Sequence, residues 1–217
     1  MLLVLLVLLL AYLLGSLPTA LVVGKLMRGI DIRQHGSGNA GGTNVFRVLG
    51  WKPGLFVMLM DAFKGFVAAI WLPRLAFSAA VLPQDTLCLF GGLAAIIGHI
   101  WTVFAGFRGG KGVGTAAGVL LALYPPLVVL ICFVVFLLVL ALTRIVSISS
   151  ISAAVAFPVV LSILKYSGSR PISATLYYFS FFAALLIIYT HRSNIRRLLN
   201  GTENKFGKKG KPTQTAG

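Results

Sequence analysis

The sequence is poor in acidic residues: 4 Asp and Glu stand against 19 Lys and Arg, which gives the 217-residue chain a formal net charge of +15. The four carboxylates (Asp31, Asp61, Asp85 and Glu203) are scattered, which disfavours the paired-carboxylate site of glycoside hydrolysis. The 3 His and 2 Cys are equally dispersed, and both cysteines lie inside apolar runs. We therefore expect no metal, no cofactor and no disulfide framework.

Charged residues make up only 11% of the chain, whereas 58% of the residues are apolar. A water-soluble domain carries about twice this charged fraction, and a chain this apolar would expose too much apolar surface. Disorder is excluded because it requires low hydrophobicity. Positive charge alone suggests nucleic-acid binding, but the apolar content places the basic residues in loops that flank membrane spans. We expect the lipid bilayer as a partner, and no nucleic acid.

The apolar runs predict an all-α integral membrane protein with seven transmembrane helices. The predicted spans cover residues 2–23, 55–72, 87–104, 113–123, 127–142, 151–164 and 173–190. The first run could be a signal peptide, but no Lys or Arg precedes it and no clear cleavage site follows, so we expect a retained helix. The fourth run is short and either extends toward Gly110 or is re-entrant. Pro125 and Pro126 predict a tight turn after it.

Seven spans place the termini on opposite sides of the membrane, and the positive-inside rule sets the direction. Fifteen Lys and Arg residues fall on one side and three on the other. This asymmetry predicts an outside N-terminus and a cytoplasmic C-terminus. We expect one domain over residues 1–206, followed by a disordered basic tail over 207–217.

The first predicted cytoplasmic loop, residues 35–47, is rich in glycine, asparagine and hydroxyl residues, and it ends on Arg47. Glycines let successive backbone N–H groups point at one anion, and a guanidinium suits phosphate geometry. Three of the glycines, with Asp61 twenty residues later, match the dinucleotide-binding pattern, but a membrane helix precedes them where that pattern needs a strand. A flexible surface turn is the plain alternative. The loop is a candidate phosphate cradle.

The second predicted cytoplasmic loop, residues 99–115, sets Arg108 and Lys111 among glycines. A P-loop needs Gly at position 105 and Ser or Thr at position 112, where this chain has Ala105 and Gly112, so the Walker motif is absent. A basic glycine-rich turn that opens a helix nevertheless favours an anion at the helix N-terminus.

Two more polar stretches lie on the predicted cytoplasmic side. Ser147 and Ser150 either contact substrate or cap the following helix. After the last span, His191 and Asn194 share one helix face, and the arginines at 196 and 197 either serve the site or hold anionic lipid headgroups.

Asp61 and Lys64 lie within a predicted span and three residues apart. They form either an intramembrane ion pair or a functional pair, because buried ionisable groups are costly in lipid. His99, at the end of a span, is a packed residue or a site residue.

In combination these motifs resemble the bacterial membrane glycerol-3-phosphate acyltransferases that use acyl phosphate as donor. The similarity runs from about residue 13 to residue 206. It is carried by Gly36, Ser37, Gly38, Asn39, Thr43 and Asn44, by Asp61, Lys64 and Gly65 in the second span, by Gly98, His99, Phe107, Arg108, Gly109, Gly110, Lys111, Gly112 and Val113, by Ser147 and Ser150, and by His191, Arg192, Asn194, Ile195, Arg197, Leu198, Gly201, Glu203 and Phe206. The chain departs from the family pattern at Gly42, Thr102, Arg108 and Gly114, and each change is small or preserves charge.

The resemblance implies transfer of an acyl group from acyl phosphate to sn-glycerol 3-phosphate, at the cytoplasmic face of the bacterial inner membrane. A soluble partner enzyme would supply the acyl phosphate, through a transient contact at most. The expected catalytic residues are Ser37, Arg47, Lys111, His191 and Asn194. The expected substrate or phosphate contacts are Gly36, Gly38, Asn39, Thr43, Asn44, Arg108, Gly109, Gly110, Gly112, Ser147, Ser150 and Glu203.

The sequence leaves the mechanism open at one point. Either His191 or the departing phosphate takes the proton of the glycerol hydroxyl. Direct transfer is favoured over an acyl-enzyme on Ser37, because acyl phosphate is already activated and Ser37 lacks a neighbouring pair of a base and the residue that orients it. The rival classes are an organic-anion transporter, which needs ionisable groups along a midplane path, and a lipid phosphotransferase or phosphatase.

Overall fold

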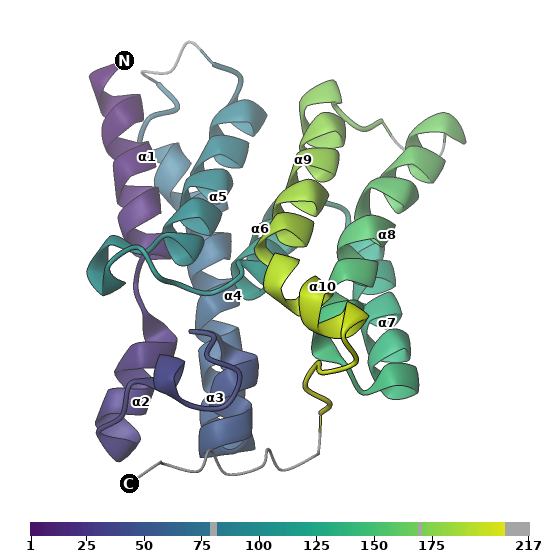
Figure 1. Cartoon of the computed structure of the whole chain (residues 1–217). Coiled ribbons are helices and arrows are strands. Elements are labelled where there is room, and N and C mark those ends of the chain that lie inside the picture. Colours follow the sequence, from purple (N-terminus) through teal and green to yellow (C-terminus); the bar gives the residue numbers. More distant parts are fainter. Residues whose placement is uncertain (79–81, 169–170, 207–217) are drawn as a thin grey trace, which may run out of the picture.

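The computed structural model describes residues 1–78, 82–168 and 171–206, and all regular structure within these ranges is helical (Figure 1). The helices are α1 (Leu2–Gly15), α2 (Thr19–Arg28), α3 (Gly42–Leu49), α4 (Trp51–Arg74), α5 (Gln84–Ile100), α6 (Val113–Leu123), α7 (Pro126–Thr143), α8 (Val146–Tyr166), α9 (Ala174–Thr190) and α10 (Arg192–Leu199), with short 3₁₀ turns η1 (Ile32–Gln34) and η2 (Val103–Ala105). The prediction of an all-α membrane protein is confirmed. The predicted tail, residues 207–217, lies outside the described residues.

Among the described residues, five helical segments are long and apolar enough to cross a membrane: α1 with α2, α4, α5 with η2, α7 and α8. The pair α9 and α10 qualifies as a sixth only if it is counted as one segment, and it bends by 58°. Helix α6 has 11 residues, so it is about 17 Å long, whereas the hydrocarbon core is about 30 Å thick. The helices make this a multi-pass membrane protein. The count of seven spans and the direction of the chain stay predictions.

The predicted first span is broken, because α1 ends at Gly15 and α2 begins at Thr19, just after Pro18. Proline donates no backbone hydrogen bond, so carbonyl groups of the preceding turn need other partners. Thr102 Oγ1 donates to the carbonyl of Ser16, and Lys64 Nζ donates to the carbonyl of Leu17 at 3.1 Å. The break is therefore held by side chains of two other segments.

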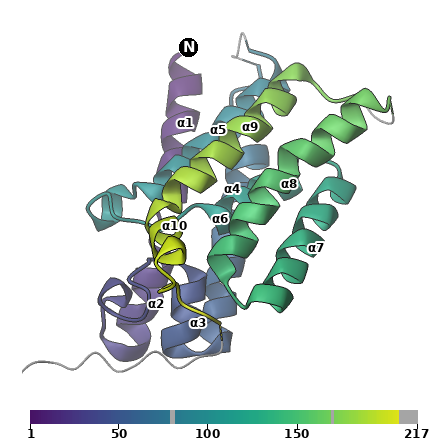
Figure 2. The ribbon, with the colours of Figure 1, turned by 45° about the vertical axis from the view of Figure 1, so that its right-hand side comes forward.

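Close packing against α4 fixes the position of the short α6. A Cβ added at Gly118 would lie 1.8 Å from the carbonyl oxygen of Ala62, and one added at Gly65 would lie 2.2 Å from that of Thr115. Only glycine permits these approaches, as is common where membrane helices cross tightly. In Figures 1 and 2, α6 lies in the middle of the bundle, with its N-terminus held beside α4.

The bundle has two sides, which α6 joins. Helices α1, α4 and α5 lie on the left of Figure 1, and α7, α8 and α9 lie on the right. Exposed apolar side chains such as Leu130, Phe133 and Leu137 cover the outer face of α7, as expected for contact with lipid. In Figure 1, α2, α3 and α10 and the loop before α3 lie in the half of the molecule away from the N-terminus, and the loop between α5 and α6 crosses the bundle near its middle.

Candidate functional site

The first glycine-rich loop is folded around one side chain, Asn44 of α3. Its Oδ1 accepts from the backbone N–H of Ser37 at 2.8 Å, and its Nδ2 donates to the carbonyls of Ile32 and His35, each at 2.9 Å. Gly36 has φ +63°, and a Cβ there would lie 2.3 Å from Asn44 Oδ1. The Asn44 amide is thus hydrogen-bonded to backbone groups at both of its ends. It stabilises the shape of the loop and has no N–H pointing free toward an anion.

The other predicted residues of this loop leave donors near the start of α3. Ser37, Asn39 and Thr43 are partly exposed, and α3 begins at Gly42, where unpaired N–H groups favour an anion. Arg47 is one turn further along α3 and half-buried. Burial lowers the pKa of Arg47, an effect that the nearby Glu203 carboxylate opposes. The loop therefore offers hydroxyl, amide and guanidinium donors together.

The second glycine-rich loop folds back on the end of α5 and touches the first loop. Gly109 N–H donates to the carbonyl of Ile100 at 3.0 Å, and Gly110 N–H donates to that of His99 at 3.1 Å. A Cβ added at Gly110 would lie 2.2 Å from His99 Nε2 and 2.8 Å from the carbonyl oxygen of Ala40. Glycine at this position lets the two loops approach closely, so they form one continuous surface.

Lys111 ends the second loop and lies close to the C-terminal motif. Thr190 Oγ1 donates to the Lys111 carbonyl at 3.1 Å, and Lys111 Nζ donates to Asn194 Oδ1. Burial, opposed by the charge of Glu203 and aided by those of Arg197 and Arg47, lowers the pKa of Lys111 from 10.5 to about 8. Gly112, with φ +82°, turns the chain into α6. Lys111 is therefore a partly desolvated cation beside a helix start.

Three side chains gather around the carboxylate of Glu203, and we call Ser147, Asn194, Arg197 and Glu203 the Glu203 cluster. Ser147 Oγ donates to Glu203 at 2.9 Å, Asn194 Nδ2 at 2.6 Å and Arg197 Nε at 2.7 Å. Burial raises the pKa of Glu203, but these hydrogen bonds outweigh it and hold the pKa below its usual range. Because Asn194 gives its Nδ2 to Glu203, its Oδ1 faces Lys111. The carboxylate therefore orients the amide that contacts the lysine.

A short C-terminal segment carries Glu203 to this position. Phe206 N–H donates to the carbonyl of Arg144 at 2.6 Å, and the Phe206 ring packs against Phe46 with centroids 4.9 Å apart. The segment thus connects α10, the turn before α8, and α3. It fixes Glu203 between elements that are far apart in the sequence.

His191 lies past the end of α9, where it is 2% exposed. Its Nδ1 contacts the carbonyl of Ile187 at 2.8 Å. A carbonyl only accepts, so this contact assigns the proton to Nδ1 and leaves Nε2 as the acceptor. Burial, and next the charge of Lys111, lower the pKa of His191 to about 4. The imidazole is therefore neutral near pH 7 and weakly basic.

The structure does not bring every predicted residue into the cluster. Ser150 is buried and donates to the carbonyl of Val146 within its own helix at 2.9 Å. The Arg108 side chain is exposed. Arg197, which the sequence left open as a site residue or a lipid contact, belongs to the Glu203 cluster. The sequence reasoning missed Arg33, which joins the two loops, and its only sequence signal was the nearby carboxylate of Asp31.

Asp61, Lys64 and His99 form a second buried cluster, which we call the Asp61 cluster. Asp61 Oδ1 lies 2.8 Å from Lys64 Nζ and 3.5 Å from His99 Nδ1. Lys64 also donates to the carbonyl of Leu17. These contacts favour the ion-pair interpretation, because the cluster ties α4 to α5 and to the break before α2. No group of three metal-ligating side chains occurs among the described residues.

The fold and the site define a class: a multi-pass helical membrane protein in which two glycine-rich loops with basic residues lie against each other. The chain belongs to the glycerol-3-phosphate acyltransferase family, whose model matches residues 5–201. The glycerol-3-phosphate acyltransferase of Chlorobaculum tepidum is 48% identical over 92% of this chain and 95% of that protein, and that of Pelodictyon phaeoclathratiforme is 48% identical over 96% and 100%.

Two solved structures are also similar to this chain. Both are crystal structures of PlsY, an integral membrane glycerol 3-phosphate acyltransferase, one in its glycerol 3-phosphate form and one in its lysophosphatidic acid form. The first has a TM-score of 0.81 and covers 94% of this chain and 96% of that chain, and the second has a TM-score of 0.79 and covers 94% and 95%. Both are 40% identical to this chain. The predicted family and membrane class are confirmed.

Proposed function

We propose that this protein transfers a fatty acyl group from acyl phosphate to sn-glycerol 3-phosphate, which yields 1-acyl-sn-glycerol 3-phosphate (lysophosphatidic acid) and phosphate. The observation that carries the proposal is the meeting of both glycine-rich loops with Lys111 and Asn194. Similar PlsY structures described as the glycerol 3-phosphate and lysophosphatidic acid forms support the acceptor and the product. Both substrates carry a phosphate, which accounts for two cradles.

Each cradle has its own donors. The first offers Ser37, Asn39, Thr43 and the start of α3, with Arg47 as its cation. The second offers the backbone of the glycine turn and Lys111, whose ammonium Asn194 orients. Holding both reactants in one geometry supplies much of the acceleration, because a reaction between two molecules becomes effectively unimolecular.

The acyl chain is expected to lie between helices or in the surrounding lipid. Ile96 of α5, Ala116 of α6, and Phe179 and Ile187 of α9 line a small apolar hollow on this side of the bundle, and the carbonyl of Ile187 accepts a hydrogen bond from His191. An acyl chain among these helices would approach the cradles from apolar surroundings.

The transfer needs no acyl-enzyme. The glycerol hydroxyl oxygen bonds to the acyl carbonyl carbon, the bond from that carbon to the phosphate oxygen breaks, and the hydroxyl proton passes to the departing phosphate. With a pKa of about 4, His191 is a weaker base than a phosphate group, whose second pKa is about 6. Among the described residues no base is hydrogen-bonded to the Ser37 hydroxyl, which disfavours Ser37 as a nucleophile.

The proposed topology keeps seven spans. Helix α6, enclosed by α4 and α5, counts as a short span, and the arginine-rich α10 lies at the membrane surface. The excess of positive charge then orients the N-terminus outward and the site toward the cytoplasm of a bacterial inner membrane. A soluble enzyme that forms acyl phosphate would meet the protein at this face.

One assay tests the reaction. Purified protein is incubated with acyl phosphate and labelled glycerol 3-phosphate, without CoA and without divalent metal. Lysophosphatidic acid is the expected product. Product formed from acyl-CoA but not from acyl phosphate would refute acyl phosphate as the acyl donor. An acyl adduct on Ser37, trapped and identified by mass spectrometry, would refute direct transfer.

A further inference from the structure

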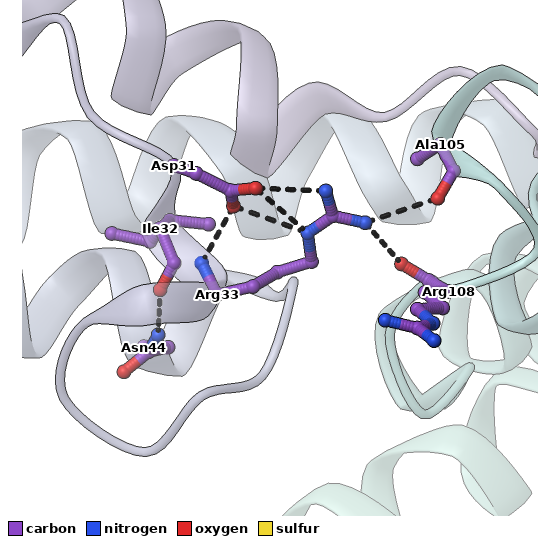
Figure 3. A network of polar contacts seen from close by, with 6 residues as sticks. All are labelled: Asp31, Ile32, Arg33, Asn44, Ala105 and Arg108. Atoms are coloured by element: carbon purple, nitrogen blue, oxygen red, sulfur yellow. Dashed lines mark hydrogen bonds and ion pairs between the residues drawn. The ribbon is translucent and has the colours of Figure 1, made fainter.

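Arg33, in η1 ahead of the first glycine-rich loop, reaches across to the second loop (Figure 3). Its Nη1 donates to the carbonyl of Ala105 at 3.0 Å and to that of Arg108 at 3.3 Å. The acceptors lie 72 and 75 residues further along the chain, and Lys111 follows them by a few residues. One side chain thus holds two backbone carbonyls of the segment that carries Lys111.

Asp31 fixes the guanidinium in place. Arg33 Nε donates to both carboxylate oxygens at 3.1 Å, Nη2 donates to Oδ2 at 2.8 Å, and the Arg33 N–H donates to Oδ1 at 2.9 Å. These hydrogen bonds lower the pKa of Asp31, so the carboxylate stays ionised. The guanidinium donates to Asp31 through Nε and Nη2 and to the second loop through Nη1. A single ammonium group cannot reproduce this arrangement.

Each loop keeps its own shape without Arg33. Asn44 closes the first loop, and the N–H groups of Gly109 and Gly110 close the second against α5. Loss of the Arg33 contacts should therefore leave both cradles folded. What it removes is a polar tie that sets one cradle relative to the other.

We infer that Arg33, held by Asp31, is a positioning residue that sets the separation between the two phosphate cradles. The inference rests on the proposed function, in which each cradle holds the phosphate of one substrate. It predicts a particular kinetic pattern. A small displacement of one cradle leaves each phosphate bound but misaligns the reacting atoms, and a displacement of about 1 Å can cost about 100-fold in rate.

The variants are Arg33→Gln, Arg33→Lys, Asp31→Asn and the double variant, with Arg28→Gln as control, because Arg28 is exposed on the neighbouring α2. Arg33→Gln should lower kcat by about tenfold or more. Its dissociation constant for glycerol 3-phosphate and its number of sites per protein, measured by calorimetry, should stay within about twofold. The unchanged number of sites separates misalignment from loss of folded enzyme.

The remaining variants test the shape of the contact. The kcat of Arg33→Lys should exceed that of Arg33→Gln by less than about threefold, because lysine restores the positive charge but not the planar guanidinium. The kcat of the double variant, Arg33→Gln with Asp31→Asn, should lie within about twofold of that of Arg33→Gln alone, because Asp31 acts through Arg33. Arg28→Gln should match the wild type.

Three results would overturn the inference: a wild-type kcat in Arg33→Gln, full recovery by Arg33→Lys, or glycerol 3-phosphate affinity that falls in step with kcat. An error in the proposed function gives a different result: if acyl phosphate is not the donor, the wild type itself makes no product from it. The series is in that case run with the donor that the wild type uses, and the ratio of each variant to the wild type still decides.

Discussion

Two buried carboxylates, Asp61 and Glu203, gather partners in different ways. Asp61 lies inside α4 and pairs with Lys64 one turn away, with side-chain exposures of 6% and 5%. Glu203 comes from a segment after α10 and collects groups from α8 and α10. Its exposure is also 6%, but that of its partner Arg197 is 32%. One cluster is closed on itself, and the other is open at its edge.

The difference separates architecture from chemistry. Lys64 uses its ammonium on Asp61 and on the carbonyl of Leu17, so the Asp61 cluster supports the break between α1 and α2. The Glu203 cluster orients Asn194, and through it Lys111, toward the two cradles. We therefore expect that breaking the first costs mainly stability, and that breaking the second costs mainly turnover.

The largest expected effect is on stability, from Asp61→Asn. Lys64 would stay buried without its counter-charge, which typically costs about 3–5 kcal/mol in the free energy of unfolding. Denaturation in detergent measures this loss, and the KM values of the protein that stays folded should not change. Asp85→Asn is the control, because Asp85 is exposed at the start of α5.

A double variant sharpens the same point. Asp61→Leu with Lys64→Met removes both charges and should recover most of the lost stability. A single Asp61→Asn variant that unfolds within about 1 kcal/mol of the wild type would contradict the architectural role.

Glu203→Gln should show the opposite pattern. The amide keeps the size of the side chain and can still accept hydrogen bonds, but it no longer offsets the charges of Lys111, Arg47 and Arg197. We expect kcat to fall by about 10- to 100-fold, with the unfolding free energy within about 1 kcal/mol of the wild type. Steady-state assays paired with denaturation measure both. A loss of stability as large as that of Asp61→Asn would erase the distinction between the clusters.

Lys111, which contacts the Glu203 cluster through Asn194, should make substrate binding depend on pH. In the ligand-free protein the pKa of Lys111 is about 8, so its ammonium is present below that pH and is lost as the pH rises through it. Affinity for glycerol 3-phosphate should then fall by up to about tenfold per pH unit above 8, because the phosphate is already a dianion there. Calorimetry between pH 7 and 9.5 measures the slope.

Lys111→Arg is the matched variant for this slope. Arginine stays charged over the whole range, so its affinity, whatever its absolute value, should be flat with pH. An equal slope in both proteins would assign the titration to another group.

The sequence was most informative where a motif is local. Membrane helices follow from apolar runs, and the two loops follow from glycines beside basic and polar side chains. Lys111 and Asn194 were both candidates, and the structure joins them by a hydrogen bond. The break at Pro18 could have been anticipated from the proline itself, but the side chains that stabilise it come from α4 and from the turn after α5.

Roles that depend on distant partners were not readable from the sequence. From the sequence, Asn44 was expected to donate hydrogen bonds to a phosphate, and only the fold shows its amide hydrogen-bonded to three backbone groups in its own loop and in η1 just before it. Arg33 is joined to carbonyl groups more than 70 residues away. No periodicity or spacing records such contacts, because they arise from how α2, α3 and α5 pack together.

The smallest effect makes the finest test, because it compares two serines on one turn of α8. Ser147 gives one of three hydrogen bonds to Glu203, whereas Ser150 donates to its own helix at Val146. Removal of one such bond is worth about 1 kcal/mol, so Ser147→Ala should lower kcat about two- to fivefold. Ser150→Ala should leave kcat unchanged, although its sequence motif suggested substrate contact. Parallel assays of the two variants decide, and equal losses would show that α8 reaches the substrate through both hydroxyls rather than through Glu203.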